Sequence, residues 1–236
     1  MRLVGTGSIL TSALSACALV NDRILVDVPN GAVKTLRRQG VEPGSLDACL
    51  ITHFHADHYF DVVFLLLELG LRRVRDEDFL LAGPRGLEER VDTLFRLAYP
   101  ESWDKVRKNS RVKFHEWTDH GGEITSGGHT VRAVPVAHTA TPAFGYLVGD
   151  GDATTGFSGD SELCDGVETI MRACSTAVLD ASFIERRAGH MGVSDLVDLA
   201  RRFPDVRVLA THVSDEVRGG DWPGVQVPDD GDRYSV

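Results

Sequence analysis

Several features that mark membrane, extracellular and nucleic-acid-binding proteins are missing from this sequence. No apolar run reaches the ~18 residues that a transmembrane helix needs, so we expect no membrane partner. The four cysteines lack Cys-x-x-Cys spacing, which predicts free thiols, buried at Cys17 and Cys49, and a cytoplasmic location. Lysine and arginine (25) are fewer than aspartate and glutamate (35), and the net charge of −10 argues against extended nucleic-acid binding.

The chain also lacks an internal boundary. No linker rich in proline, glycine or serine and no block of like charge divides it, and 42% of its 236 residues are hydrophobic. The apolar segment before Cys17 resembles a lipoprotein signal, but polar residues at 5–8 and 11–12 interrupt it, so we expect no cleavage. We therefore expect one domain over residues 1–236.

The spacing of apolar and turn residues predicts two strand-rich halves, each with helices. Strands are expected over 2–4, 13–20, 24–28, 46–52, 79–82, 112–117, 130–136, 144–148, 153–157, 176–179 and 206–210. Helices are expected over 32–39, 58–69, 87–98 and 194–202, the second of them ending at Gly70. This order predicts an α/β fold in which two mixed β-sheets pack face to face with helices on the outer faces, an αββα sandwich.

The most informative segment is the hexapeptide His53-Phe54-His55-Ala56-Asp57-His58, which follows an apolar run. Zinc and similar metals take imidazole nitrogens and carboxylate oxygens at about 2.0–2.2 Å. His53 and His55 point the same way in extended backbone, because side chains two apart share a face. Asp57 and His58 follow the bend and can face a second ion. A solvated histidine-rich loop is the alternative, and the strand–loop–helix context favours the metal site.

Three later polar residues lie where predicted strands end. They are His138, Asp160 and His212. Each alone could equally be a surface histidine or a turn aspartate. Together with the hexapeptide they complete two coordination shells.

This order of ligands resembles that of the metallo-β-lactamase superfamily over nearly the whole chain. Within the superfamily, the chain is most similar to the branch of ribonuclease Z and the cyclic-phosphate phosphodiesterases. The supporting segments are Gly5-Thr6-Gly7-Ser8, Leu25-Val26-Asp27, Ile51-Thr52-His53, Ala82-Gly83-Pro84, residues 138–146, Phe157-Ser158-Gly159-Asp160, Gly189-His190, Thr211-His212-Val213-Ser214 and Asp230-Gly231.

The resemblance implies two divalent metal ions, zinc foremost, with manganese and iron as alternatives. The first would be held by His53, His55, His138 and Asp160. The second would be held by Asp57, His58, Asp160 and His212. Asp160 would bridge the ions, and a hydroxide shared between them would be the nucleophile.

Roles for neighbouring residues also follow from the resemblance. Asp57 and His190 are the candidate catalytic residues, and His190 would protonate the leaving group or stabilise the transition state. Asp27 and Asp180 resemble carboxylates that orient metal-bound imidazoles. Apart from Asp57, each could instead be an ordinary residue at a turn, a strand end or the start of a helix. Arg186 and Arg187 could contact a phosphate or belong to a solvated loop.

Two departures from ribonuclease Z bear on the substrate. Ribonuclease Z carries a long arm that grips transfer RNA between the bridging aspartate and the later histidine, whereas Asp160 and His190 are only 30 residues apart here. The glycine usual after the metal motif is replaced by Tyr59-Phe60-Asp61, which narrows the pocket or packs inside. We therefore expect a small-molecule substrate.

The leading hypothesis is a dinuclear metal-dependent phosphodiesterase that acts on a small, open or cyclic, phosphodiester. The alternative is a lactone, thioester or β-lactam hydrolase that uses the same metal site, in which an oxyanion would need metal or donor contact. A non-catalytic metal-binding protein is a third hypothesis, and the complete ligand set argues against it. Members of the resembled family often form dimers, so we expect a homodimer.

Overall fold

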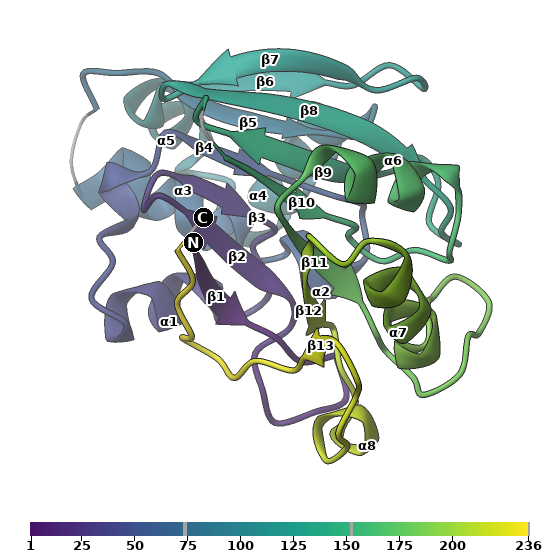
Figure 1. Ribbon diagram of the computed structural model, residues 1–236. Coiled ribbons are helices and arrows are strands. Elements are labelled where there is room, and N and C mark those ends of the chain that lie inside the picture. Colours follow the sequence, from purple (N-terminus) through teal and green to yellow (C-terminus); the bar gives the residue numbers. More distant parts are fainter. Residues whose placement is uncertain (73–74, 152, 236) are drawn as a thin grey trace.

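Two β-sheets form the centre of the molecule, and helices lie on their outer faces (Figure 1). The structure is a computed structural model that describes residues 1–72, 75–151 and 153–235. The predicted α/β class and the αββα sandwich are confirmed.

The first sheet has six strands, and their order across the sheet is their order along the chain. β1 to β3 run antiparallel, whereas β3 to β6 run parallel, so the sheet is mixed. The strands are β1 (Arg2–Gly5), β2 (Cys17–Val20), β3 (Ile24–Val26), β4 (Ala48–Leu50), β5 (Phe79–Gly83) and β6 (Val112–Glu116).

The second sheet has seven strands in the order β13-β12-β11-β10-β9-β8-β7. β10 to β13 are parallel and β7 to β10 antiparallel, so this sheet is also mixed. The strands are β7 (Gly122–Ser126), β8 (His129–Val136), β9 (Ala143–Gly149), β10 (Thr154–Phe157), β11 (Thr176–Asp180), β12 (Arg207–Thr211) and β13 (Val225–Gln226).

Helices belong to both halves of the chain. The first half contains α1 (Ala32–Arg38), the 3₁₀ turn η1 (Pro43–Ser45), α2 (Ala56–Tyr59), α3 (Val62–Leu67), the π-helical turn η2 (Glu68–Arg72), α4 (Leu87–Ala98) and α5 (Trp103–Ser110). The second half contains α6 (Asp165–Ala173), α7 (Val193–Arg202) and α8 (Asp215–Arg218). Within the described residues, every helix is too short or too polar to cross a bilayer.

The alternation of strand residues divides the core into layers. In β3, Ile24 and Val26 point inward and pack with residues of the other sheet such as Phe144 and Tyr146. Leu25, between them, points outward into the cluster that α1, α3, α4 and α5 complete. A third cluster joins α6, α7 and α8 to the outer face of the second sheet. Burial on both faces explains why these strands are almost continuously apolar.

The helix predicted over residues 58–69 is wrong in two respects. It is broken between α2 and α3, because the N–H of Asp61 donates to the carbonyl of Val28 (3.0 Å) instead of continuing the helix. It also does not end at Gly70, since η2 carries the chain through that residue. A Cβ at Gly70 would lie 2.7 Å from the Val106 carbonyl oxygen, so glycine serves close packing against α5 there.

Other predicted elements lie close to their observed positions. Residues 87–98 form α4 as predicted, and α1 and α7 match within one residue at each end. The strand predicted over 13–20 begins only at Cys17, because residues 8–16 form a loop. The sequence analysis missed α5, α6, α8, β7 and β13.

Candidate metal centre

The hexapeptide connects β4 to α2, so its predicted strand–loop–helix placement is confirmed. His53 and His58 are buried, whereas His55 is exposed and Asp57 is intermediate. One side of the cluster is therefore closed by the core and the other side is open to a substrate.

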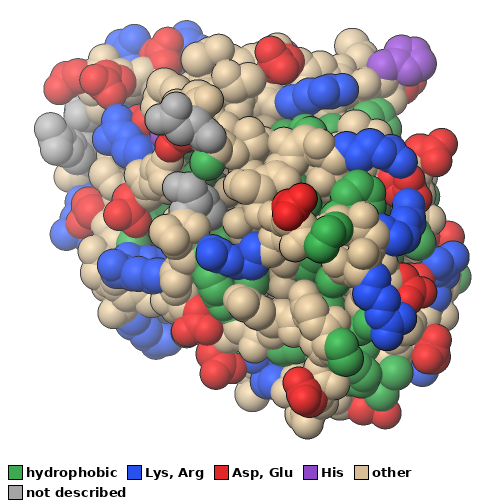
Figure 2. Space-filling view, viewed as in Figure 1, with side chains coloured by type: hydrophobic (Ala, Val, Ile, Leu, Met, Phe, Trp, Pro, Cys, Tyr) green, Lys and Arg blue, Asp and Glu red, His purple; other side chains and the backbone are tan. Residues whose placement is uncertain are grey.

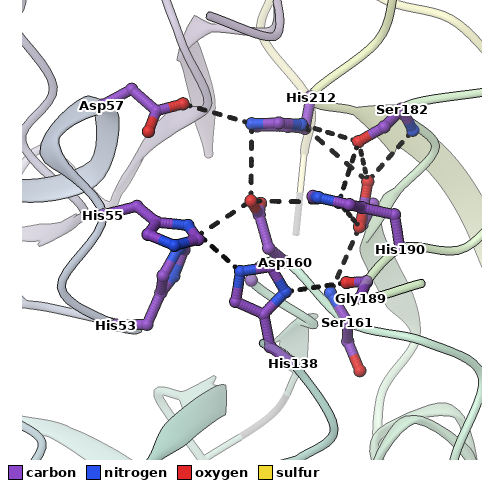
Figure 3. A network of polar contacts seen from close by, with 12 residues as sticks. His53, His55, Asp57, His138, Asp160, Ser161, Ser182, Gly189, His190 and His212 are labelled. Atoms are coloured by element: carbon purple, nitrogen blue, oxygen red, sulfur yellow. Dashed lines mark hydrogen bonds and ion pairs between the residues drawn. The ribbon is translucent and has the colours of Figure 1, made fainter. Parts of the chain in front are cut away.

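The other three predicted ligands come from the second sheet. His138 follows β8, Asp160 follows β10 and His212 follows β12. β10, β11 and β12 are parallel neighbours, so Asp160 and His212 emerge at one edge. The seven predicted ligand residues are thus brought together from two sheets, and all of them except His58 are labelled in Figure 3.

The distances between ligand atoms divide the cluster into two groups. In one group, His138 Nε2 lies 3.2 Å from His55 Nδ1, and His53 Nε2 lies 3.8 Å from Asp160 Oδ2. In the other, His212 Nε2 lies 3.4 Å from Asp57 Oδ2 and 3.5 Å from Asp160 Oδ2. His58 Nε2 lies 3.3 Å from Asp160 Oδ1. Asp160 therefore contacts imidazoles of both groups.

These separations fit metal ligation. Ligand atoms about 2.0–2.1 Å from a tetrahedral ion are roughly 3.3–3.4 Å apart, close to the spacing observed here. Three of the atoms concerned, His53 Nε2, His58 Nε2 and Asp160 Oδ1, are buried and form no hydrogen bond of good geometry, although the last two lie 3.3 Å apart. Buried polar atoms are rarely left unpaired, so these three point to an ion as their partner.

A family model described as "Beta-lactamase superfamily domain" matches residues 22–213. The chain belongs to the metallo-β-lactamase superfamily. The resemblance stated from the sequence is confirmed, and the His and Asp groups of the cluster could hold divalent metal ions.

The sequence of this protein is also similar to that of a ribonuclease Z. A ribonuclease Z of Bradyrhizobium diazoefficiens is 34% identical over 125 residues, which are 53% of this chain and 40% of that protein. The chain thus matches less than half the length of that relative.

Solved structures share the fold across nearly the whole chain. The short form of human tRNase Z superposes with a TM-score of 0.79 at 18% identity, covering 100% of this chain and 99% of that one. A diphosphatase of the PhnP family superposes with a TM-score of 0.73 at 19% identity, covering 99% and 96%.

Asp27, which follows β3, orients two imidazoles of the metallo-β-lactamase cluster. Its Oδ2 accepts a hydrogen bond from His58 Nδ1 (2.8 Å) and another from the Thr52 hydroxyl (2.9 Å). That hydroxyl lies 3.0 Å from His53 Nδ1. Asp27 therefore holds His58 directly and His53 through a hydroxyl, which turns the Nε2 atom of each ring toward the cluster.

Asp180, the last residue of β11, repeats this arrangement in the second sheet. Its Oδ2 accepts a hydrogen bond from His190 Nδ1 (2.8 Å), and its Oδ1 accepts one from the Ser182 hydroxyl (2.6 Å). That hydroxyl lies 2.7 Å from His212 Nδ1. Each sheet thus supplies one buried carboxylate that contacts one imidazole directly and a second imidazole through a hydroxyl. The orienting roles expected of Asp27 and Asp180 agree with these contacts.

Backbone geometry fixes two of these positions. Asp27 has φ of 59° and His212 has φ of 56°, a left-handed conformation that residues other than glycine adopt rarely. His138 is fixed differently, because its Nδ1 donates to the Gly189 carbonyl (2.7 Å) and leaves Nε2 facing His55.

The charges in the cluster favour a cation. Burial holds the pKa of His53 well below its ordinary value, so its ring is neutral and can ligate. Burial alone would lower the pKa of His58, but the carboxylates of Asp160 and Asp27 raise it well above its ordinary value. Burial alone would raise the pKa of Asp160, but His212 and His58 hold it well below the usual range. These carboxylates attract positive charge, which a proton or a metal ion can supply.

Two arginines that could have contacted a phosphate interact with other side chains of the protein instead. Arg186 makes two hydrogen bonds to Asp195 at 2.6 and 3.2 Å, and Arg187 lies over the Phe183 ring, 4.2 Å from its centroid. Both arginine side chains are therefore held by contacts within the protein. The sequence analysis did not identify the hydroxyls of Thr52 and Ser182, although each stands one or two residues from a residue it had singled out.

Proposed function

We propose that this metallo-β-lactamase superfamily protein is a dinuclear metal-dependent phosphodiesterase that acts on small phosphodiesters, including cyclic ones. The observation that carries the proposal is the pairing of a complete ligand cluster with His190 at its open edge. The Asp180 carboxylate fixes His190 Nδ1 at 2.8 Å, and the side chain keeps 21% of its area exposed. The PhnP-family diphosphatase among the structural neighbours also supports a substrate that contains phosphate.

Two ions, with zinc foremost, would be held by the two groups of ligand atoms described above. The first group is His53, His55, His138 and Asp160, and the second is Asp57, His58, Asp160 and His212. When bound, the ions supply an activated water as nucleophile and stabilise negative charge on the substrate oxygens. Asp57 is partly exposed and lies at the open side, where its carboxylate can also accept the proton of the attacking water.

His190 is the proposed general acid. Because Nδ1 donates to Asp180, the other ring nitrogen, Nε2, is left to carry a proton to the leaving oxygen. The imidazole ring of His190 lies parallel to that of His212, with centroids 5.6 Å apart. This contact places the acid beside the second group of ligands, where a phosphodiester on the ions would present its leaving group.

The short segment between Asp160 and His190 and the net charge of the chain both bear on the kind of substrate that we propose. The relatives include ribonuclease Z, but between Asp160 and His190 the chain forms only α6, β11 and their short connections. A chain with a net charge of −10 also offers little attraction for an RNA backbone outside the cluster. We therefore propose a small substrate and no extended nucleic acid. The four free thiols support a reducing compartment such as the cytoplasm, and residues 1–236 are proposed to act as one domain.

The test is hydrolysis of two phosphodiesters by protein with two equivalents of zinc. Bis(p-nitrophenyl) phosphate has a leaving group that needs no protonation, whereas a cyclic alkyl phosphodiester has only an alkoxide leaving group, which does. Asp160→Ala should abolish turnover of both. His190→Ala should slow the alkyl cleavage by about 10²–10⁴-fold and the p-nitrophenyl cleavage much less, because only the former needs an acid.

His120→Ala is the matched control, since His120 is exposed in the turn before β7 and lies outside the cluster. It should leave both rates unchanged. Equal losses on both substrates in His190→Ala would reject the general-acid role. A fully metallated wild type that cleaves a lactone or thioester but no phosphodiester would overturn the proposed function.

A further inference from the structure

One carboxylate near the candidate metal centre has no place in either group of ligands. Glu162 follows Asp160 by two residues, in the connection between β10 and α6, and is partly buried. Acidic and basic side chains are interspersed over the face of the molecule seen in Figure 2. The Glu162 carboxylate instead binds the backbone, where its Oε1 accepts a hydrogen bond from the N–H of Gly189 (2.7 Å). This bond joins the segment that carries Asp160 to the segment that carries His190.

Gly189 is hydrogen-bonded through both of its polar backbone groups. Its N–H donates to Glu162, and its carbonyl accepts a hydrogen bond from His138 Nδ1 (2.7 Å; Figure 3). Glycine suits this position, since φ is 81° and a Cβ would lie 3.2 Å from His138 Nδ1. Glycine also resists backbone rotation less than other residues do. The direction of its carbonyl, and with it the orientation of the His138 ring, therefore depends on what holds the N–H.

The contact gives His138 what the other buried ligand imidazoles already have. Each of the other three is linked to a carboxylate by hydrogen bonds, either directly or through a hydroxyl. His138 differs, because its Nδ1 donates to a backbone carbonyl. Carboxylates behind ligand imidazoles fix the orientation of the ring and increase metal affinity. Glu162 supplies such a carboxylate for His138, with Gly189 in the place that a hydroxyl takes elsewhere.

The same hydrogen bond attaches the turn that presents His190. In this turn the N–H of His190 donates to the Arg187 carbonyl (3.0 Å), and the N–H of Arg187 donates to the His190 carbonyl (3.2 Å). Just before His190 the turn is held by Glu162, and just after it the N–H of Met191 donates to the Ser161 carbonyl (2.7 Å). The turn is therefore fixed to the end of β10 on both sides of His190.

We propose that Glu162 is a positioning residue of the candidate metal centre, which acts through the N–H of Gly189. It fixes the carbonyl that orients His138 and the turn that presents His190. The part that concerns His138 stands on the geometry alone, whereas the part that concerns His190 rests on the proposed function. The accepted hydrogen bond, and not the negative charge, is the essential property. An amide oxygen at position 162 should therefore largely replace the carboxylate.

The first test is nuclear magnetic resonance of the full-length, zinc-loaded protein. Labelling the alanine carbonyl with ¹³C and the glycine nitrogen with ¹⁵N selects glycines that follow an alanine, and the sequence has two, Gly83 and Gly189. A hydrogen bond to a carboxylate moves an N–H proton downfield and slows its exchange with solvent. Glu162→Ala should therefore move the Gly189 signal upfield and speed its exchange about tenfold or more, whereas Glu162→Gln should keep most of the protection. The Gly83 signal should stay unchanged and reports an intact fold.

The second test is a zinc titration in competition with a chelator. Loss of a group that orients a ligand imidazole lowers metal affinity about 10–100-fold. Glu162→Ala should show this loss in the binding step that His138→Ala also weakens, and Glu162→Gln should recover most of it. The matched control is Glu185→Ala, because Glu185 is exposed on the same loop and its carboxylate accepts a hydrogen bond from the Ser194 hydroxyl (3.2 Å). It should change neither the zinc affinity nor the Gly189 signal.

Hydrolysis rates test the part that concerns His190. Glu162→Ala should slow cleavage of the cyclic alkyl phosphodiester more than cleavage of bis(p-nitrophenyl) phosphate, because only the former needs the acid. Equal slowing of both substrates would reject this part of the proposal.

A Gly189 signal and a zinc affinity in Glu162→Ala that both match wild type would overturn the proposal. Equal losses in Glu162→Gln and Glu162→Ala would also overturn it, because the charge and not the hydrogen bond would then be essential. If Glu162→Ala moves the Gly83 signal as well, Glu162→Asp takes its place, since its side chain is one methylene shorter. The signal and the zinc affinity do not depend on hydrolysis. A wild type that cleaves no phosphodiester would therefore remove the proposed function without deciding the role of Glu162 at His138.

Discussion

The hydroxyl of Ser182 gives the sharpest test of how the candidate metal centre is built. It lies 2.7 Å from His212 Nδ1 and 2.6 Å from Asp180 Oδ1, and both side chains are buried. Ser182→Ala leaves the Nδ1–H of His212 without its acceptor, while Asp180 keeps its bond from His190. The effect should fall on the ion that His212 holds.

These contacts set the expected size of the loss in zinc affinity. Loss of a group that orients a ligand imidazole lowers metal affinity by about 10–100-fold. That range corresponds to roughly 1.4–2.8 kcal/mol, which agrees with the ~1–3 kcal/mol cost of one unpaired buried polar group. We therefore expect the site to which His212 belongs to lose 10–100-fold in zinc affinity, with little change in the other site.

The assay is a zinc titration of metal-free protein in competition with a chelator of known affinity. Ser161→Ala is the matched control, because Ser161 is also buried in this cluster but its hydroxyl donates to the Glu162 carbonyl and contacts no imidazole. An unchanged affinity in Ser182→Ala, or an equal loss in Ser161→Ala, would show that the Ser182 hydroxyl does not orient His212. Circular dichroism of each metal-free variant controls for unfolding.

Three further predictions concern stability and reactivity. Asp61→Ala should lower the free energy of unfolding in urea by about 1–3 kcal/mol, because the buried N–H of Val33 loses its acceptor at 2.9 Å. Gly159→Ala should cost about 2 kcal/mol or more and weaken zinc binding, since φ is 59° and the new Cβ would lie 2.9 Å from Thr52 Cβ. Burial raises the pKa of Cys174 to about 12, so at pH 8 about one thiol in ten thousand is ionised and Cys174→Ser should not change the count of thiols that react rapidly with Ellman's reagent.

The ligand cluster was predictable because its combination of residue types and spacing rarely occurs outside metal sites. His53, His55 and Asp57 have no packing reason to occur together. Apolar runs in the sequence predict the strands that end just before Asp160 and His212. The hydroxyls of Thr52 and Ser182 carried no such signal. Serine and threonine occur in many loops, and only the tertiary structure places these two between an imidazole and a carboxylate.

The wrong helix prediction has a different cause. Gly70 resembles a helix stop in sequence, but glycine is also used where another backbone comes close, as Val106 does here. α6 was missed although Val167, Ile170 and Met171 lie at helical spacing and are buried. β7 was missed because its residues are mostly exposed, so its sequence lacks the apolar alternation by which a strand is detected.

The origin of the ligands in both sheets has a consequence for the protein in a cell. His53, His55 and His58 come from one layer of the sandwich and His138, Asp160 and His212 from the other, so bound ions would cross-link the two layers. Ligands that bind only the folded state increase its stability by mass action. Metal starvation would therefore raise the fraction of unfolded chains and expose them to proteases, so that the abundance of the protein would follow the supply of its metal.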